Sequence, residues 1–291
     1  MNPETAYLRQ LATRVVEAAT ARLDIRAALL AGSAGRGNAD RFSDLDLLFY
    51  VERVPTNEEV EAVREAVSGE NPLRRSEATD FANGEEFQLG GVRTEVSFTL
   101  IEHVEWLLDQ LLVELDDIAS PRQKFLSGLA EGMPLYGDEL IRRWQTRVRG
   151  YPEPFRAEMI RRHWNFFPLW YHREAMSLRD TELWRLDVLL EGVFNLLGVL
   201  AAINRIYFAR FELKRTRDLI SKMAVAPPEL ADRIEALVHL PAQDAAREFG
   251  QLVAETAELV SREVPDATVD LSFPLDARQQ PWHLPEDAVG S

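Results

Sequence analysis

The sequence predicts an α+β protein, in which a small mixed β-sheet with helices is followed by an all-α helical bundle. Two short apolar runs, 25–31 and 45–51, flank a glycine-rich turn and have the length and composition of buried strands. Alternating residues on either side of Gly90-Gly91 predict a β-hairpin over 86–100. No clear strand pattern follows residue 138, whereas helical spacing continues, so we expect the sheet and the bundle to form separate domains.

The predicted domain boundary lies in the segment 132–138, which reads GMPLYGD. We expect the first domain to cover residues 1–135 and the helical domain to cover residues 136–291. Past residue 265 the chain holds several prolines and shows no periodicity. The last part of the second domain is therefore expected to be an extended tail.

Helical spacing and capping residues predict the helices of both domains. Thr56 or Asn57 can cap the second helix, and Pro121 can open the fourth. Residues 69–84 are polar and are expected to be irregular. The predicted helices cover residues 4–22, 57–68, 101–117, 121–131, 139–149, 153–178, 180–209, 219–224, 228–240 and 242–264.

Composition restricts the classes of protein to consider. The 291 residues can bury a sizeable core, and 46% hydrophobic with 28% charged residues is an ordinary globular composition. Because there is no cysteine, disulfides, zinc–thiolate sites and thiol catalysis are excluded. The first residues, MNPETAYLRQ, lack the layout of a signal peptide, so we expect a cytoplasmic protein.

The formal net charge is −15, which disfavours broad, nonspecific nucleic-acid binding because such binding needs a basic surface. A strongly acidic protein would attract a cationic substrate. The same charge is equally well explained by solubility alone.

The segment from Gly32 to Asp46 has the residues expected of a phosphate and metal site. Asp44 and Asp46 are two residues apart at the start of a strand, so their side chains project to one face. Two carboxylates so close repel each other unless a cation lies between them, and oxygen ligands suit Mg²⁺. Just upstream, the backbone N–H groups of a Gly32-Ser33 turn can bind phosphates.

This combination resembles the DNA polymerase β-like nucleotidyltransferase superfamily. The motif is a Gly-Ser after a strand, a spacer of ten residues, and an Asp-x-Asp inside an apolar strand. The run GSAGRG…SDLDLL looks most like the small bacterial members, which include the aminoglycoside and lincosamide nucleotidyltransferases. The matching pieces lie within residues 29–95, about a third of the chain.

The resemblance implies a reaction and a role for each motif residue. The reaction would be transfer of a nucleoside monophosphate, AMP from the co-substrate ATP, to a hydroxyl of a small molecule such as an antibiotic, with release of pyrophosphate. Gly32 and Ser33 would hold the β- and γ-phosphates, and Asp44 and Asp46 would bind Mg²⁺. Arg36 would either touch phosphate or hold the turn together.

The family also needs a third carboxylate on a later strand, and Glu95 is the candidate. In the strand over 92–100, Glu95 shares one face with Arg93 and Ser97, opposite the apolar face. The resemblance implies that Glu95 is either a metal ligand or the base that activates the acceptor hydroxyl. A solvated strand face is the alternative.

Polar residues recur every four positions in the long helix predicted from Asp180 or Thr181. Asp187, Glu191 and Asn195 form one narrow stripe on an otherwise apolar helix, and they argue against a membrane span. The stripe is either the solvated edge of a buried helix or a surface that holds the acceptor. We therefore take Asp187 and Glu191 as candidate substrate-binding residues.

Lys214 and Tyr207 are candidate nucleotide-binding residues in the helical domain. Lysine is rare, with three against thirty arginines, and a compact ammonium can neutralise phosphate. A surface lysine on a fraying helix end is the alternative. A cluster of five aromatics is either a helix–helix seam or a wall that stacks on a ring, and it consists of Trp164, Phe166, Phe167, Trp170 and Tyr171.

The expected partners are a nucleoside triphosphate and a small-molecule acceptor, without a membrane or nucleic acid. The expected oligomeric state is a monomer or a homodimer. Two alternatives remain: AMP transfer to a protein or tRNA end, and nucleotide binding without catalysis. Transfer to a macromolecule is suggested by local arginine clusters, at Arg142, Arg143, Arg147, Arg149, Arg161 and Arg162.

Overall fold

The computed structural model describes residues 1–75, 78–116, 118, 122–166 and 182–267. The chain divides into two compact units, Met1–Pro152 and Glu153–Ser291. Each unit is described by itself.

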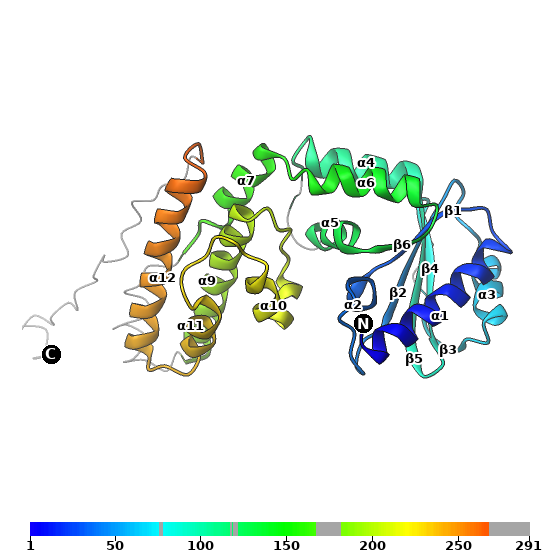
Figure 1. The fold of residues 1–291 in the computed structure, drawn as a ribbon, viewed down its shortest axis with the longest axis horizontal. Coiled ribbons are helices and arrows are strands. Elements are labelled where there is room, and N and C mark those ends of the chain that lie inside the picture. Colours follow the sequence, from blue (N-terminus) through cyan, green and yellow to red (C-terminus); the bar gives the residue numbers. More distant parts are fainter. Residues whose placement is uncertain (76–77, 117, 119–121, 167–181, 268–291) are drawn as a thin grey trace, which may run out of the picture. The chain divides into compact units, whose positions relative to one another are not determined.

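The first unit is built on a mixed six-stranded sheet, as predicted, and the fold class is α+β (Figure 1). The strand order is β3-β4-β5-β2-β1-β6, and only the β2–β5 pair among these is parallel. The strands are β1 (Ile25–Leu30), β2 (Leu45–Val51), β3 (Glu70–Arg75), β4 (Ala82–Leu89), β5 (Val92–Leu100) and β6 (Met133–Tyr136).

Helices of the first unit cover both faces of the sheet. Their bounds are α1 (Pro3–Thr20), α2 (Gly32–Arg36), α3 (Asn57–Ala66), α4 (Ile101–Leu112), α5 (Arg122–Glu131) and α6 (Asp138–Arg149). One face, with Leu47 and Phe49, forms a core with apolar residues of α1 and α3. On the other face, Tyr50 packs edge-to-face on Trp144 of α6, with 4.8 Å between ring centroids.

The predicted strands 25–31 and 45–51 and the 86–100 hairpin are confirmed as β1, β2 and the β4–β5 pair. The helix predicted from residue 57 is confirmed as α3. Thr56 and Glu59 form a capping box at its start, so the predicted cap is correct.

The prediction of irregular structure over 69–84 is wrong, because the segment contains β3 and the start of β4. β3 is an edge strand paired only with β4, and its register shifts between Glu70 and Arg74. An edge strand faces solvent along one side and lacks the apolar alternation that would identify it in the sequence.

The predicted boundary near residue 135 is too early. Met133–Tyr136 is a strand, β6, which pairs with β1. The following helix, α6, belongs to the first unit, because Gln145 donates to the carbonyls of Leu129 and Gly132.

The second unit is helical. Its elements are α7 (Glu153–His163), α9 (Glu182–Ile203), the 3₁₀ helix η1 (Arg210–Arg215), α10 (Thr216–Ser221), α11 (Leu230–Leu237) and α12 (Ala242–Glu263). By length and mean hydropathy (1.9) α9 could cross a membrane, but 72% of its most apolar window is buried inside the protein.

The ends of α9 and α7 differ most from the prediction, and α4 ends at Leu112 rather than near residue 117. α9 ends at Ile203 rather than near residue 209, because Arg205 adopts a left-handed φ of 57° and Ile206 N–H bonds back to Ala201 O at 2.8 Å. α7 ends at His163. The predicted continuation over 167–178, the caps Asp180 and Thr181, Pro121 and most of the tail lie outside the described residues.

The described aromatics of the cluster predicted near residue 165 are packed together. Trp164 meets Phe166 edge-to-face at 5.3 Å, and Phe166 is buried against Phe249 of α12 at 5.9 Å. This favours a packing role for the two residues over a wall that stacks on a ring, although they follow the end of α7 and do not lie in a helix. Phe167, Trp170 and Tyr171 lie outside the described residues.

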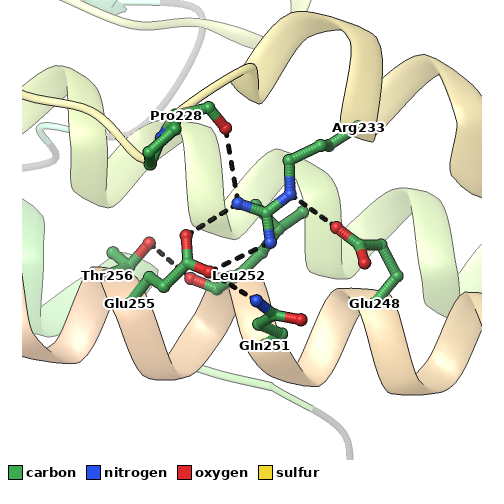
Figure 2. A network of polar contacts seen from close by, with 7 residues as sticks. All are labelled: Pro228, Arg233, Glu248, Gln251, Leu252, Glu255 and Thr256. Carbon is green, nitrogen blue, oxygen red and sulfur yellow. Dashed lines mark hydrogen bonds and ion pairs between the residues drawn. The ribbon is translucent and has the colours of Figure 1, made fainter.

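An arginine joins α11 to α12 (Figure 2). Arg233 donates from Nε to Glu248 at 2.5 Å and from both terminal nitrogens to Glu255 at 2.7 and 3.1 Å. These contacts hold the pKa of Glu255 below its usual value. The Arg233 side chain is only 16% exposed, so the network is partly shielded from water.

We expect Arg233→Met to lower the free energy of unfolding by about 1–3 kcal/mol, because two carboxylates then lose their shared partner in a partly buried site. Urea unfolding measures the change. Arg247→Met is the matched control, since Arg247 is exposed and its pairing with Asp244 should contribute under about 0.5 kcal/mol. Equal losses in both variants would show that the Arg233 network does not stabilise the bundle.

Candidate active site

The glycine-rich turn forms a short helix, α2, whose first residue packs on a carboxylate. Gly32 has a left-handed φ of 63°, and a Cβ at this position would lie 2.3 Å from Asp46 Oδ2. Ala31 N–H also donates to Asp46 O at 3.0 Å. Only glycine therefore fits where the turn meets β2.

The turn is held rigidly from two sides. Arg9 of α1 donates to Ala34 O at 3.1 Å and to Gly35 O at 3.0 Å. Gly35 lies so close to β1 that a Cβ would come within 2.3 Å of Leu30 O. Because the first N–H groups of a helix have no acceptor within it, this braced turn offers fixed donors.

Ser33 contributes to the site through its backbone. Its side chain is buried, with the residue 3% exposed, while its carbonyl accepts from Gly37 N–H at 2.9 Å. The predicted phosphate contact at Ser33 would therefore be made by its N–H group.

Three acids form a row across three neighbouring strands. Asp46 of β2 lies directly beside Glu95 of β5, which in turn lies opposite Glu86 of β4. Laterally paired residues in a sheet share a face, so the three side chains start from the same side. Asp44 lies two residues before Asp46 and belongs to the same face.

Arg93 is the counter-ion within this row. It makes a bidentate contact with Glu86, at 2.8 and 2.7 Å, and its Nη1 is 3.9 Å from Asp44 Oδ2. The contact with Glu86 raises the pKa of Arg93, so the guanidinium is permanently charged. Glu86 is thereby neutralised, and the excess negative charge remains on Asp44, Asp46 and Glu95.

That excess charge is reflected in the titration of Asp46. Burial, followed by the charges of Asp44 and Glu95, raises the pKa of Asp46 from 3.8 to about 6. The positive charges of Lys124 and Arg36 act in the opposite direction. A carboxylate so placed gains from a cation that enters the site.

Two cations approach the row from the side of α5 and α2. Arg36 of α2 pairs with Glu131 of α5 at 3.5 Å, which ties the turn to that helix. Lys124 lies seven residues before Glu131 and thus on the same helix face. The holding role considered for Arg36 is therefore present, and its charge also acts on Asp46.

Glu86, Arg93 and Lys124 were not among the site residues predicted from the sequence. The predicted hairpin register already places Glu86 opposite Glu95, and Arg93 shares Glu95's face, so both could have been found. Lys124 depends on the packing of α5, for which the sequence has no local signal.

Asp44 and Asp46 fit a magnesium ion by their chemistry. Within the described part of the chain, no three His, Cys, Asp or Glu side chains form a cluster ready to hold a metal. Mg²⁺, however, commonly takes one or two carboxylates and completes its shell with waters and substrate phosphates. Burial, and after it the neighbouring charges of Asp44 and Glu95, raises the pKa of Asp46, so a bound cation would stabilise its charged form.

The three residues of the polar stripe on α9 have different surroundings. Asp187 is exposed, whereas Glu191 pairs with Arg210. Asn195 is buried, where its carbonyl oxygen lies 3.1 Å from His163 Nδ1 and its amide donates to Asn165 O. Asn195 therefore stabilises the bundle, and the substrate role stays a prediction for Asp187 and Glu191.

The two nucleotide-binding candidates of the second unit have different surroundings. Tyr207 is 6% exposed and packs edge-to-face on Phe155 at 5.4 Å, and burial raises its pKa. This environment favours a packing role. Lys214 lies with its Nζ 3.7 Å from the centroid of Phe211, on η1 rather than at the end of the long helix.

A hollow of about 570 Å³ lies in the second unit, beside the network of Figure 2. Its walls come from the loop before α11, from α11 and from α12. None of the predicted site residues lines it. Arg233, its basic residue, is engaged by two glutamates.

Comparison with known proteins yields one solved structure to report. No family model and no curated protein matches the chain. The structure of a nucleotidyltransferase-like protein from Exiguobacterium sibiricum 255-15 matches 90% of this chain and 81% of its own, at 12% identity and a TM-score of 0.39.

We expect the free energy of unfolding of the metal-free protein to fall as the pH rises from about 4 to about 6. The folded state binds the Asp46 proton more tightly than the unfolded state, since its pKa is raised from 3.8 to about 6, so deprotonation in that window favours unfolding. Asp46→Asn should remove this fall and raise the free energy of unfolding at pH 7 by on the order of 2 kcal/mol.

Urea unfolding in EDTA across this pH range measures the effect. Asp24→Asn is the control, because Asp24 is exposed just before β1, at the opposite end of the antiparallel β1–β2 pair. If the wild type and Asp46→Asn depend on pH in the same way, the pKa of Asp46 is not raised by its burial and its acidic neighbours as described.

Proposed function

We propose that this chain is a nucleotidyltransferase that transfers AMP from ATP to a hydroxyl of a small molecule, such as an antibiotic of the aminoglycoside or lincosamide type. The observation that carries the proposal is the packing of the Gly32 turn on Asp46, beside Asp44 and Glu95. Backbone N–H groups that can bind phosphates lie there beside carboxylates at the start of β2, an interior strand of the sheet.

In the proposed reaction the acceptor oxygen bonds to the α-phosphorus while the bond to the bridging oxygen of pyrophosphate breaks. The backbone donors of Gly32 and Ser33 hold the phosphates of the leaving group, and Lys124 and Arg36 balance its charge. A Mg²⁺ ion held by Asp44 and Asp46 would neutralise the phosphate oxygens during transfer.

Glu95 takes the acceptor's proton in this scheme. It is exposed at the edge of the site, where an acceptor can reach it, and it lies beside Asp46 on the neighbouring strand. A carboxylate within hydrogen-bond distance of the acceptor hydroxyl can act as a general base.

Transfer to a protein or tRNA is less well supported. The arginines that suggested it are engaged within their own units: Arg143 and Arg147 with Glu105 and Asp109, and Arg161 and Arg162 with Glu158. Arg142 pairs with Asp138, and Arg149 donates to Ala130 O. A small-molecule acceptor is therefore favoured.

We expect labelled ATP with Mg²⁺ to transfer label to one member of a panel of hydroxyl-bearing antibiotics. Asp44→Asn and Asp46→Asn should each abolish this transfer while the fold is retained, because each removes a proposed metal ligand. Protein and RNA acceptors are tested in parallel, and Asp24→Asn is the control variant with the same chemical change.

Binding provides a check that does not depend on the acceptor. ATP with Mg²⁺ at about 100 times its Kd should stabilise the protein by about 2.7 kcal/mol, and ATP with EDTA should do so much less. The proposal is overturned if no nucleotide raises the Tm at saturation. Binding without transfer to any acceptor class would favour a non-catalytic module.

The three lysines of the chain allow a separate test of the phosphate contacts. Lys124→Ala should weaken MgATP binding about tenfold, because it removes a cation that acts on Asp46. Isothermal titration compares it with Lys214→Ala, the contact predicted in the second unit, and with Lys222→Ala, whose Nζ pairs with Asp218 at 3.1 Å. If all three variants bind MgATP as tightly as the wild type, none of the lysines contacts the phosphates.

A further inference from the structure

Phe42 is exposed to solvent and lies two residues before Asp44 of the candidate active site. It is 97% exposed, which is the largest value among the large hydrophobic residues of the described chain. In the same unit Phe49, Phe87 and Phe98 are fully buried, and Phe81 is 41% exposed. The Phe42 side chain therefore stays exposed to water, which is unfavourable for a large apolar group.

The loop that carries Phe42 is fixed by side-chain hydrogen bonds. Phe42 N–H donates to Asp40 Oδ1 at 2.9 Å, and Ser43 Oγ donates to the same oxygen at 3.1 Å. Asp40 N–H in turn donates to Ser43 Oγ at 2.9 Å. These bonds hold the backbone of the turn in one conformation.

The loop is also tied to α1. Ala39 N–H donates to Thr5 Oγ1 at 3.2 Å, and Asn2 Nδ2 donates to Ala39 O at 2.7 Å. Arg41 pairs with Glu4 at 3.6 Å. The exposure of Phe42 is thus imposed by a braced loop rather than by a free chain end.

Both ends of this loop belong to the site. It leaves α2 where Gly37 and Asn38 donate to Ser33 O, at 2.9 and 3.1 Å. It ends at Asp44, two residues after Phe42, which limits their Cα separation to about 7 Å. The loop therefore starts at the phosphate donors, ends at the carboxylates and borders the site.

We propose that Phe42 stacks on the nucleobase of the bound nucleotide. This inference rests on the proposed function, which supplies a nucleoside triphosphate to the turn that starts the loop. An exposed flat ring fixed by its backbone is suited to covering another flat ring. The nucleobase is the planar ring that every nucleoside triphosphate contains.

Comparing two ligands separates stacking from the phosphate contacts. ATP and inorganic tripolyphosphate, both with Mg²⁺, share the phosphate chain, and only ATP has a base. Phe42→Ala should weaken ATP about 5- to 150-fold, the range found when a base-stacking aromatic is removed, and should leave tripolyphosphate affinity unchanged. Phe42→Trp should restore ATP binding. Isothermal titration measures both ligands.

Trp106→Ala is the matched control. Trp106 is an exposed aromatic, 49% accessible, on the helix that follows the far end of β5, and its removal should change neither affinity. Because Phe42 is exposed, the Tm of Phe42→Ala without ligand should equal that of the wild type.

The remaining outcomes overturn the inference in distinguishable ways. If the wild type binds ATP and Phe42→Ala binds it equally well, stacking is refuted and the proposed function stands. If Phe42→Ala loses ATP and tripolyphosphate to the same extent, the residue supports the loop rather than the base. If the wild type binds neither ligand, the proposed function fails, and the stacking role fails with it.

Discussion

The contact between the Gly32 backbone and the Asp46 carboxylate sets the geometry of the first unit's site. The Asp46 carboxylate leaves no room for a Cβ on residue 32, so only glycine lets the turn approach β2 this closely. The Ala31–Asp46 hydrogen bond and the Arg9 brace keep them there. Without this close contact, the backbone donors of the turn and the carboxylates of β2 would not lie at one site.

The carboxylates of the site are only partly paired with positively charged side chains of the first unit. Arg93 satisfies Glu86 with good bidentate geometry and reaches Asp44 only at 3.9 Å. Arg36 is shared with Glu131, and Lys124 acts at longer range. The carboxylate that packs on the turn, Asp46, has a raised pKa in spite of these cations, which is an arrangement that a cationic or metal-bound substrate can exploit.

Much of this fold follows from local signals in the sequence. Apolar runs predict β1 and β2, the Gly90-Gly91 pair predicts the β4–β5 hairpin, and Thr56 predicts the start of α3. Each signal is short-range, since strands, tight turns and caps are encoded by neighbouring residues. Strand alternation put Asp44 and Asp46 on one face, and the family resemblance pointed to Glu95, which the structure pairs with Asp46.

The features that escaped prediction depend on distant partners. β3 and β6 are edge strands whose pairing is decided by β4 and β1 and not by their own alternation. Lys124 acts on the site because α5 packs near α2, and Tyr207 is buried because apolar residues of the second unit, such as Phe155, pack on it. Such long-range packing leaves little trace in a local pattern.

The parallel pairing of β2 with β5 also bears on how the chain folds. β1, α2 and β2 are consecutive, so the turn and the Asp pair can form early from neighbouring residues, whereas Glu95 arrives only when a distant strand docks. Closing that loop carries an entropic cost, and in this protein the docking strand also brings a third negative charge to the other two. The repulsion that Glu95 adds is therefore felt only when β5 docks, and cations in the medium should speed that step more than the pairing of β1 with β2.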